Sequence, residues 1–325
     1  MRFLDNNKNM SRLYLIRNPE VFQGEKYLKM GKNYFEGWYF KNISKGEGIS
    51  FIPGINIEET NKKAFIQVIT NSSSYFIDYS INDFRFGHNP FYIKIGKNIF
   101  SKDFIYLDIL DNKQNIKING KIKYTNNQNI KTNTLSPNIM GPFSYLPFME
   151  CNHAILSMKN TAIGEIAIND KTMKFNNGNG YIEKDWGTSF PKSYIWCQGN
   201  NFKKKNASCM IAIADIPLKI LNFRGIICDL ILDSKEYKFT TYNNSKIIKY
   251  IVNGNLLCIT LKKNNYYLEV KSLFDKGLKL SAPVKGKMQK NIFESISANV
   301  SIILRLGNKV IFSDSSTNCG IEVVK

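Results

Sequence analysis

The sequence predicts an all-β protein built from closed antiparallel sheets. Short runs rich in β-branched and aromatic residues, such as 64–70 and 74–86, recur along the chain between polar turns. No segment carries the sustained 3.6-residue apolar pattern of a long helix. With 325 residues, 43% of them hydrophobic, the chain is long enough for one large β domain or two ordinary domains. Many short strands joined by tight turns are typical of a sandwich or a barrel.

Taken in order, the first 33 residues are polar and aperiodic, and we expect them to form an N-terminal arm. Residues 114–125 alternate apolar and polar side chains around Asn119-Gly120, which predicts a hairpin with a two-residue turn. Residues 164–175 predict another hairpin, and the polar, glycine-containing run NNGNGY that follows predicts a hinge. We therefore divide the chain into domains of residues 1–178 and 179–325. The second half repeats the strand-like texture at 208–216, 225–232, 236–242, 256–263, 265–272, 300–306 and 309–314.

The formal net charge of +19 is large, and it is compatible with an anionic partner such as a membrane surface, an acidic lipid or nucleic acid. The lysines are nevertheless dispersed, and the densest cluster, 203–205, is only three residues long. No nucleic-acid motif accompanies them. We attribute the charge mainly to a composition rich in lysine, asparagine and isoleucine, and we expect no nucleic-acid partner.

The N-terminal residues lack the apolar core of a signal peptide, and no stretch approaches the roughly 20 apolar residues that span a bilayer. The six cysteines include no C-x-x-C pair, which predicts buried thiols rather than disulfides. These observations predict a cytoplasmic protein, and peripheral contact with a membrane is left open.

Two runs concentrate the residues that carry chemistry. Residues 180–202, GYIEKDWGTSFPKSYIWCQGNNF, contain two carboxylates and two of the three tryptophans, and residues 34–42, YFEGWYFKN, contain the third. Carboxylates are seldom buried without partners, so such runs are poor core sequence. We predict that both runs line one site. The alternative is that the tryptophans belong to the core and the acids form structural ion pairs.

The same runs resemble two signatures of the tocopherol cyclase family. The central signature is a Glu-Lys-(Asn/Asp)-Trp-Gly motif, followed after a short gap by Phe-Pro and then by Trp-x-Gln-x-Asn. The second signature, near the N-terminus, is FEGWYFK. GPFSYLPFMECNHAILSM (141–158), FESISANVSIILR and NCGIEVV are similar to the bacterial branch of that family. The resemblance implies two consecutive lipocalin-like β-barrels. It also implies acid chemistry, because tocopherol cyclases protonate an alkene whose cation a phenol oxygen captures, and related lipocalin-like enzymes of the carotenoid hydratase type add water to such a bond.

Other chemistries find little support in the sequence. Only two histidines are present, and no cysteine pair completes a metal-ligand set at the usual spacing, so we predict no metal site. Neither a glycine-rich phosphate loop nor a G-x-S-x-G nucleophile elbow occurs. What remains is acid catalysis without a cofactor, in an apolar cavity where burial keeps a carboxyl protonated and aromatic faces stabilise a cation.

Asp185 is the first candidate for the acid, followed by Glu183 and Glu36. In extended structure Glu183 and Asp185 share one face of a strand, while Lys184 and Trp186 share the other. The two acids are therefore expected to lie close enough to share a proton. The family pattern has Asn as well as Asp at position 185, which keeps Glu183 as an alternative. The residues expected to bind the substrate are Trp38, Tyr39, His153, Trp186, Trp196, Gln198 and Asn200.

The sequence thus predicts a tocopherol cyclase-like enzyme, an intramolecular lyase or isomerase, that cyclises or hydrates an isoprenoid or other hydrophobic alkene. The alternative is a lipophilic-ligand binding protein of the same fold without turnover. Acids that all pair with Lys or Arg would favour the binding protein, and a carboxyl that faces the ligand would favour the enzyme. The native substrate and the oligomeric state do not follow from the sequence.

Overall fold

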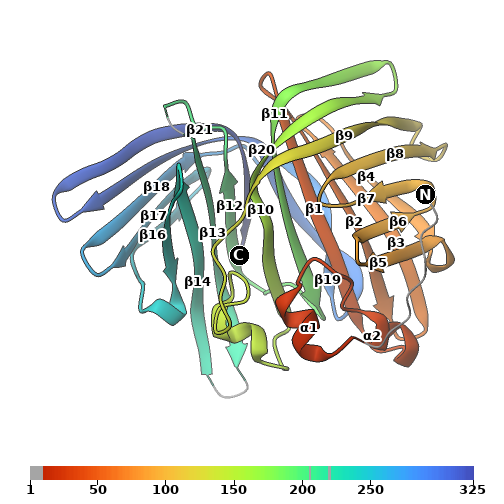
Figure 1. Ribbon diagram of the computed structural model, residues 1–325, viewed down its shortest axis with the longest axis horizontal. Coiled ribbons are helices and arrows are strands. Elements are labelled where there is room, and N and C mark those ends of the chain that lie inside the picture. The colour runs from red at the N-terminus through yellow and green to blue at the C-terminus, as the bar shows by residue number, and fades with distance from the viewer. Residues whose placement is uncertain (1–9, 205, 219–220) are drawn as a thin grey trace.

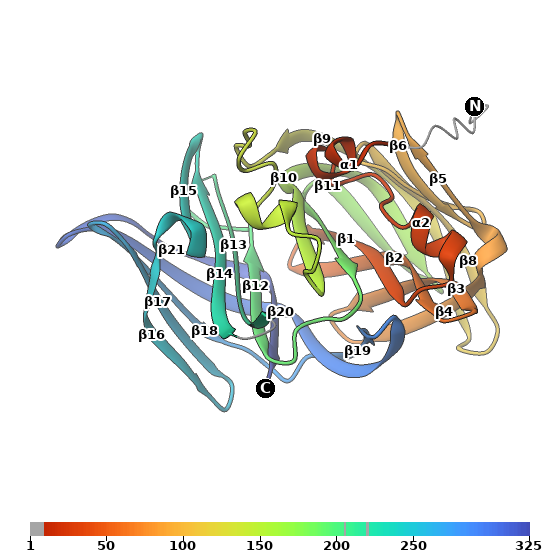
Figure 2. The same ribbon diagram turned by 90° about the horizontal axis from the view of Figure 1, so that it is seen from below.

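The computed structural model describes residues 10–204, 206–218 and 221–325. Within these ranges almost all regular structure is β, arranged as two large antiparallel sheets that lie side by side (Figure 1). The first sheet curls into a nearly closed barrel, and the second lies beside it (Figure 2). The predicted fold class, all-β with two consecutive lipocalin-like units, is confirmed.

The first sheet has eleven strands among the described residues, in the order β4-β3-β2-β1-β11-β10-β9-β8-β7-β6-β5. The strands are β1 (Tyr34–Ser44), β2 (Glu47–Glu58), β3 (Asn61–Thr70), β4 (Ser74–Ser80), β5 (Phe84–His88), β6 (Phe91–Ile95), β7 (Asn98–Phe100), β8 (Phe104–Asp111), β9 (Ile116–Gln128), β10 (Cys151–Ile168) and β11 (Lys171–Gly187).

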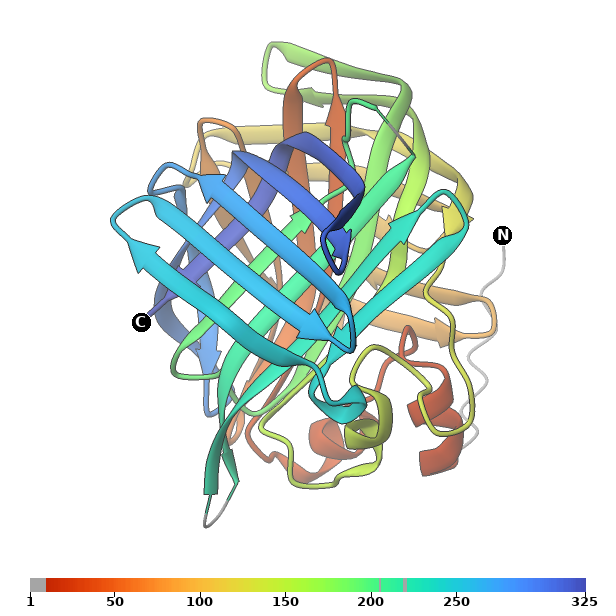
Figure 3. The ribbon, with the colours of Figure 1, turned by 90° about the vertical axis from the view of Figure 1, so that its left-hand side faces the viewer.

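The second sheet has ten strands in the described part of the chain, ordered β15-β14-β13-β12-β21-β20-β18-β17-β16, with β19 paired to β20 (Figure 3). They are β12 (Tyr194–Gly199), β13 (Ala207–Leu218), β14 (Leu221–Leu232), β15 (Lys235–Thr240), β16 (Lys246–Asn253), β17 (Leu256–Lys263), β18 (Tyr266–Leu273), β19 (Leu278–Val284), β20 (Lys287–Leu306) and β21 (Lys309–Val324).

Helical structure is short wherever the chain is described. The predicted N-terminal arm contains two single-turn helices, α1 (Arg12–Arg17) and α2 (Glu25–Met30), and three 3-10 turns connect strands elsewhere: η1 (Ile81–Asp83), η2 (Gly141–Tyr145) and η3 (Thr241–Asn243). None of the described helices is long and apolar enough to cross a bilayer. The cytoplasmic location and the membrane contact stay predictions. The six cysteines are free thiols, as predicted.

Alternation along the strands produces separate apolar cores. In β1, Trp38 and Phe40 point into the first barrel, whereas Tyr39 points to a cluster between the two sheets. In β12, Ile195 points into the second sheet's own core and Trp196 into the same inter-sheet cluster. The region between the sheets is therefore a third core, built from one face of each sheet.

The hairpin of β19 and β20 joins the two halves of the chain. It belongs to the second sheet by sequence, yet it lies against the edge of the first barrel beside β4 (Figure 2). The side chain of Gln67 on β3 donates to the carbonyl of Ser281 and accepts from its N–H, at 3.0 and 2.8 Å. The hairpin therefore closes one side of the space between the sheets.

One predicted turn is a strand interior instead. Asn119-Gly120 lies inside β9, where Gly120 adopts φ 141° and a Cβ would stand 2.2 Å from the carbonyl oxygen of Glu165 on β10. The glycine is thus required by a close strand approach and not by a turn. The hairpin of 164–175 does form, with its turn at 169–170.

The predicted hinge at 176–181 lies inside β11, so the boundary at 178/179 falls within a strand. The chain passes from the first sheet to the second between Gly187 and Tyr194. Consequently the EKDWG motif, which we assigned to the second domain, belongs to the first sheet. Because the β19–β20 hairpin crosses back, the division into two domains stays a prediction.

A buried ion pair fixes the N-terminal arm inside the first barrel. Lys184 Nζ lies 2.5 Å from Glu36 Oε1, and both side chains are completely buried. The ammonium also donates to the carbonyls of Pro19 and Val21, each at 2.7 Å, so all three of its protons are used. The carboxylate accepts from Tyr34 Oη at 2.7 Å and from the N–H of Gln23 at 2.9 Å. These bonds match an ionised pair that is fully satisfied.

Replacing Lys184 with Met leaves the carboxylate of Glu36 buried without its cation, so we expect the free energy of unfolding to fall by about 3–5 kcal/mol. Urea unfolding measures this change. The matched control is Lys97→Met, which removes a pair with Asp108 whose lysine side chain is 78% exposed. We expect the control to change stability by less than about 1 kcal/mol. Equal effects of the two substitutions would contradict the structural role of the buried pair.

Candidate active site

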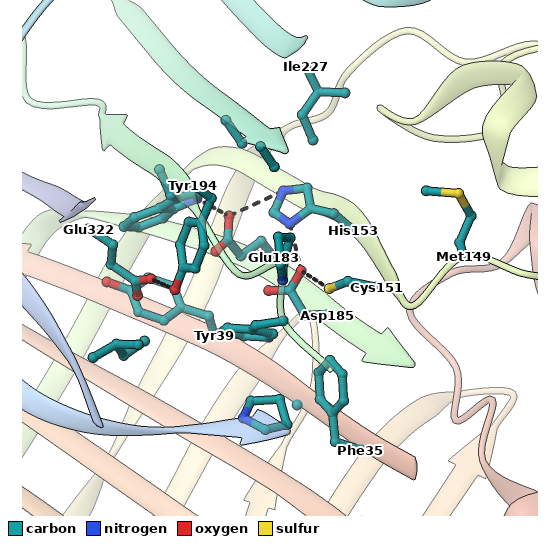
Figure 4. A pocket seen from close by; sticks show the side chains of 18 of the residues that line it. Phe35, Tyr39, Met149, Cys151, His153, Glu183, Asp185, Tyr194, Ile227 and Glu322 are labelled. Atoms are coloured by element: carbon teal, nitrogen blue, oxygen red, sulfur yellow. Dashed lines mark hydrogen bonds and ion pairs between the residues drawn. The ribbon is translucent and has the colours of Figure 1, made fainter. Parts of the chain in front are cut away.

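A cavity of about 170 Å³ lies between the two sheets, and its wall is mainly apolar. Strands β1 and β11 of the first sheet, β12 to β14 and β21 of the second, the β19–β20 hairpin and the turn η2 all contribute to it. Its polar side chains gather in one place, where Glu183, Asp185, His153 and Glu322 point into it (Figure 4). The remaining wall includes Phe35, Ile52, Phe65, Met140, Phe143, Met149, Phe190, Ile216, Phe223, Ile227, Leu280, Met288 and Ile292.

Glu183 is held in the wall by two donors. Tyr181 Oη donates to its Oε2 at 2.5 Å, and Trp196 Nε1 donates to the same oxygen at 3.0 Å. Tyr181 lies two residues earlier on the same face of β11, and Trp196 comes from the second sheet. The other oxygen of Glu183 is left available to carry a proton.

His153 on β10 stands beside Glu183. Its Nε2 lies 3.6 Å from Glu183 Oε2, while its Nδ1 lies 2.9 Å from Asp185 Oδ1. His153 and Asp185 are cross-strand partners, and Ile155 pairs with Glu183 one step along. The pairing of β10 with β11 thus places an imidazole between two carboxyl groups that share one strand face. Cys151 on β10 pairs with Gly187 on β11, and its Sγ makes a weak contact with Asp185 at 4.0 Å.

The electrostatics of this group differ from residue to residue. Burial lowers the pKa of His153, but attraction to Asp185 and Glu183 and the hydrogen bond to Asp185 outweigh it and raise the pKa to about 9. Burial raises the pKa of Glu183 to about 7, with His153 opposing and Asp185 adding to the shift. At neutral pH the imidazole is therefore charged, and Glu183 exchanges its proton readily.

Two further carboxyls lie nearby, each bonded to a tyrosine. Tyr194 Oη donates to Glu322 Oε2 at 2.5 Å, and Tyr39 Oη donates to Glu294 in a short hydrogen bond. Glu294 and Glu322 are cross-strand partners on β20 and β21. Burial, reinforced for Glu294 by Glu322 and for Glu322 by Glu183 and Asp185, raises the pKa of both to about 8. Glu322 in the cavity wall and Glu294 behind it therefore favour the protonated form at neutral pH.

His153, Glu183 and Asp185 also offer ligand atoms within 4.8 Å of one another, the one such group among the described residues. Three ligands match the number in a catalytic zinc site. However, Asp185 engages Nδ1 of the imidazole and Glu183 lies on the side of Nε2. A single ion binds one ring nitrogen, so it would leave one carboxylate bonded to the other. The arrangement fits proton transfer through the imidazole better than metal binding.

The comparisons with known proteins concern the family and the fold. The family model described as tocopherol cyclase-like matches residues 111–324, which is more than half of the chain. The chain belongs to the tocopherol cyclase-like family. The match spans β10, β11 and β21, and therefore includes His153, Glu183, Asp185 and Glu322. A search of curated protein sequences gives no match.

Solved structures confirm the fold of this family member. CghA, solved with Sch210972, is 7% identical with a TM-score of 0.57, and the alignment covers 90% of this chain and 88% of CghA. A protein from Nitrosomonas europaea with the provisional name AttH is 10% identical with a TM-score of 0.55, and the alignment covers 90% of this chain and 93% of that one. At such identities the likeness concerns the fold alone.

The structure brings together five of the residues predicted for the site: Asp185 and Glu183 as acids, and Tyr39, His153 and Trp196 around them. It places the other five elsewhere. Glu36 was a wrong candidate, because it pairs with Lys184 inside the first barrel and does not face the cavity.

Trp38 and Trp186 also turn into the first barrel, where the ammonium of Lys184 lies 4.8 Å from each ring. Gln198 is buried behind the cavity wall and accepts from Lys41 at 3.2 Å. Asn200 donates to backbone carbonyls of Gly180 and Met158, so it satisfies backbone groups, as the alternative interpretation held. These four residues do not line the cavity.

Sequence reasoning missed Glu322, Glu294 and the two tyrosines Tyr181 and Tyr194. Both acids lie in the C-terminal motifs that carried the family resemblance, FESISANV and NCGIEVV. For Glu322, which stands between Ile321 and Val323, the available signal was an acid flanked by apolar residues, because such a residue must find a partner or stay neutral.

We expect imidazole NMR to find His153 protonated at neutral pH, with a pKa of about 9. Asp185→Asn removes the nearest negative charge and should lower that pKa. His88, the second of the two histidines in the sequence, serves as internal control, because burial lowers its pKa and it has no contact with Asp185. A pKa of His153 that is unchanged in Asp185→Asn would contradict the assigned pairing.

The raised pKa of His153 also makes the stability of the fold depend on pH. Since the pKa of His153 is higher in the folded chain than its ordinary value of 6.5, its charge contributes stability that is complete below pH 6.5 and lost as the pH rises through about 9. Thermal unfolding across this range should show the loss in the wild-type chain and a smaller loss in Asp185→Asn.

Proposed function

We propose that this protein catalyses the addition of an O–H group across a carbon–carbon double bond of an apolar, isoprenoid-like substrate. The hydroxyl belongs either to the substrate, which gives cyclisation, or to water, which gives hydration. The observation that carries the proposal is the placement of His153 between the carboxyls of Glu183 and Asp185, with Glu322 nearby, in a cavity whose wall is mainly apolar.

The chemistry follows from that setting. Adding a proton to an alkene creates a carbocation on the neighbouring carbon, and the oxygen then attacks it and loses its own proton. Glu183 supplies a site for proton transfer, and His153 lowers the pKa of its carboxyl. Asp185 holds the imidazole in place through Nδ1. Asp185 is therefore a positioning residue in this proposal, in place of the acid we first expected.

The aromatic wall suits the cation. The rings of Tyr39, Trp196 and Phe190 border the cavity, and Tyr39 and Trp196 pack edge to face at 5.4 Å. Aromatic faces attract a cation by about 0.5–2 kcal/mol, with the larger values in dry sites. An apolar cavity of roughly 150 Å³ holds a molecule the size of benzene. The reactive end of an isoprenoid chain fits such a space.

The second candidate is a binding protein that holds a lipophilic ligand without turnover. CghA, which has the same fold, was solved with Sch210972, so the fold accommodates small molecules. Glu322, an acid in the cavity wall with no cationic partner within 4.0 Å among the described residues, favours the enzyme, because a carrier gains nothing from the cost of burying it.

The test is native mass spectrometry with lipid extraction on protein purified from its own host, comparing wild type with Glu183→Gln. We expect wild type to carry a cyclised or hydrated product and Glu183→Gln to carry the open-chain alkene, because its turnover should fall about 100-fold or more. Glu47→Gln, at an exposed position outside the cavity, is the matched control and should behave as wild type.

Other outcomes separate the candidates. The same unmodified lipid in all three proteins would favour the binding protein. No lipid in any of them would contradict the cavity as a binding site. Treatment with a chelator should leave the product of wild type unchanged, and loss of product would instead assign the His153 cluster to a metal.

A further inference from the structure

Addition of O–H to an alkene requires two proton transfers, one to carbon and one from oxygen. The cavity contains two carboxyls suited to different halves of this reaction. Glu183 comes from β11 of the first sheet and Glu322 from β21 of the second, and both point into the same space (Figure 4). The inference below rests on the proposed function and assigns the two halves.

Glu322 is set up to remain protonated. It is half-buried, and no Lys, Arg or His of the described chain lies within 4.0 Å of its carboxyl; the hydrogen bond that Tyr194 Oη donates to its Oε2 at 2.5 Å opposes protonation but does not outweigh the loss of solvent. The titratable groups that face it carry no positive charge to stabilise an anion. They are Tyr194 on β12, Glu294 on β20, and Glu183 and Asp185 on β11.

The setting of Glu294, the neighbour of Glu322, extends this acidic region behind the wall. Its Oε2 is buried and makes no hydrogen bond within the described protein, while its other oxygen accepts from Tyr39. Lys41, the nearest cation on that side, is buried and bonds to Gln198. A second buried carboxyl without an ion pair next to Glu322 disfavours ionisation of either one.

Glu183 has the opposite setting. The charged imidazole of His153 lies 3.6 Å from its Oε2, and two donors, Tyr181 and Trp196, bond to that oxygen. A cation and two hydrogen-bond donors stabilise the carboxylate form. When the environments of two carboxyls differ in this way, the more easily ionised group serves as the base and the other as the acid.

We propose that Glu322 is the catalytic acid and that Glu183 is the catalytic base. Glu322 gives its proton to one alkene carbon, forming a C–H bond and leaving a cation on the neighbouring carbon. The hydroxyl oxygen bonds to that carbon, and its O–H bond breaks as the proton moves to Glu183. Proton exchange with solvent then restores the protonated form of Glu322 and the carboxylate form of Glu183. No oxidant or reductant takes part, and Tyr194 positions the carboxyl of Glu322.

Infrared difference spectroscopy on the purified chain tests the protonation state without a substrate. At neutral pH we expect a carbonyl band of a buried protonated carboxyl that is lost in Glu322→Gln, retained in Glu183→Gln, and lost in wild type as the pH rises through about 8. Glu294→Gln identifies the neighbouring band. Tyr194→Phe keeps the carboxyl but removes a bond to it, so the band should persist to higher pH. A band unchanged in Glu322→Gln would overturn the proposal.

Turnover of a prenylated phenol in deuterated water tests the roles. The rate should rise as the pH passes about 7, where Glu183 ionises, and fall as it passes about 8, where Glu322 ionises. Deuterium should appear on the carbon that received the proton, and Glu322→Gln should lower the rate at least 100-fold.

A rate that only falls above pH 7, with Glu322→Gln as active as wild type, would assign the acid to Glu183 and overturn this inference while the proposed function stands. If the prenylated phenol is bound but neither wild type nor any variant converts it, while protein from the host carries only unmodified lipid, the proposed function fails and the inference fails with it.

Discussion

The two-residue alternation of β11 is the constraint on which the rest of the site depends. One face of this strand gives Lys184 to the interior of the first barrel, where it pairs with Glu36, and the other gives Glu183 and Asp185 to the cavity. A shift of one residue in its pairing would exchange the two faces. The buried ion pair opposes such a shift, because the shift would move the ammonium of Lys184 into the cavity and leave the carboxylate of Glu36 unpaired. The structural and the chemical charges of the motif are therefore coupled through one strand.

The position between two sheets explains the unusual state of the acids. Apart from the Lys184–Glu36 pair in the first barrel, the interior of each sheet is filled mainly by aliphatic and aromatic side chains, whereas Glu183, Asp185, His153 and Glu322 face the space between the sheets. There, burial favours the neutral form of a carboxyl, and the tyrosines bonded to Glu183 and Glu322 oppose this only in part, because they supply a hydrogen bond without a charge. His153 is the exception, and its charge is kept by Asp185.

Much of this could be predicted from sequence, because alternation is a local property. The all-β class and the common face of Glu183 and Asp185 both follow from side-chain periodicity. The same rule applied to β1 separates Glu36 and Trp38 from Tyr39, and the error at Glu36 came from grouping acids by nearness to tryptophan. The predictions of a hinge at 176–181 and of a turn at Asn119-Gly120 had another source of error. The glycines at these positions permit close contact between neighbouring strands, and the chain does not turn at them.

The contacts that join distant segments could not be predicted from periodicity. The bond of His153 to Asp185 depends on the register of β10 against β11, and that register shifts at three irregularities along the pair. Glu322 reaches the cavity because β21 pairs with β12, and this pairing joins strands separated by more than a hundred residues. A single sequence contains the residues of both pairs but not the register that matches them.

The polar and the apolar parts of the cavity wall come largely from different strands, so substitutions can change one part without the other. The acids lie on β11 and β21 and the imidazole on β10, while η2, β14 and the β19–β20 hairpin contribute apolar side chains to the wall. Exchanging Phe143, Ile227 or Met288 for smaller or larger residues would reshape the space without touching a proton-bearing group. In evolutionary terms, such a scaffold can acquire new substrates through changes in its turns and hairpin while it inherits the same reaction.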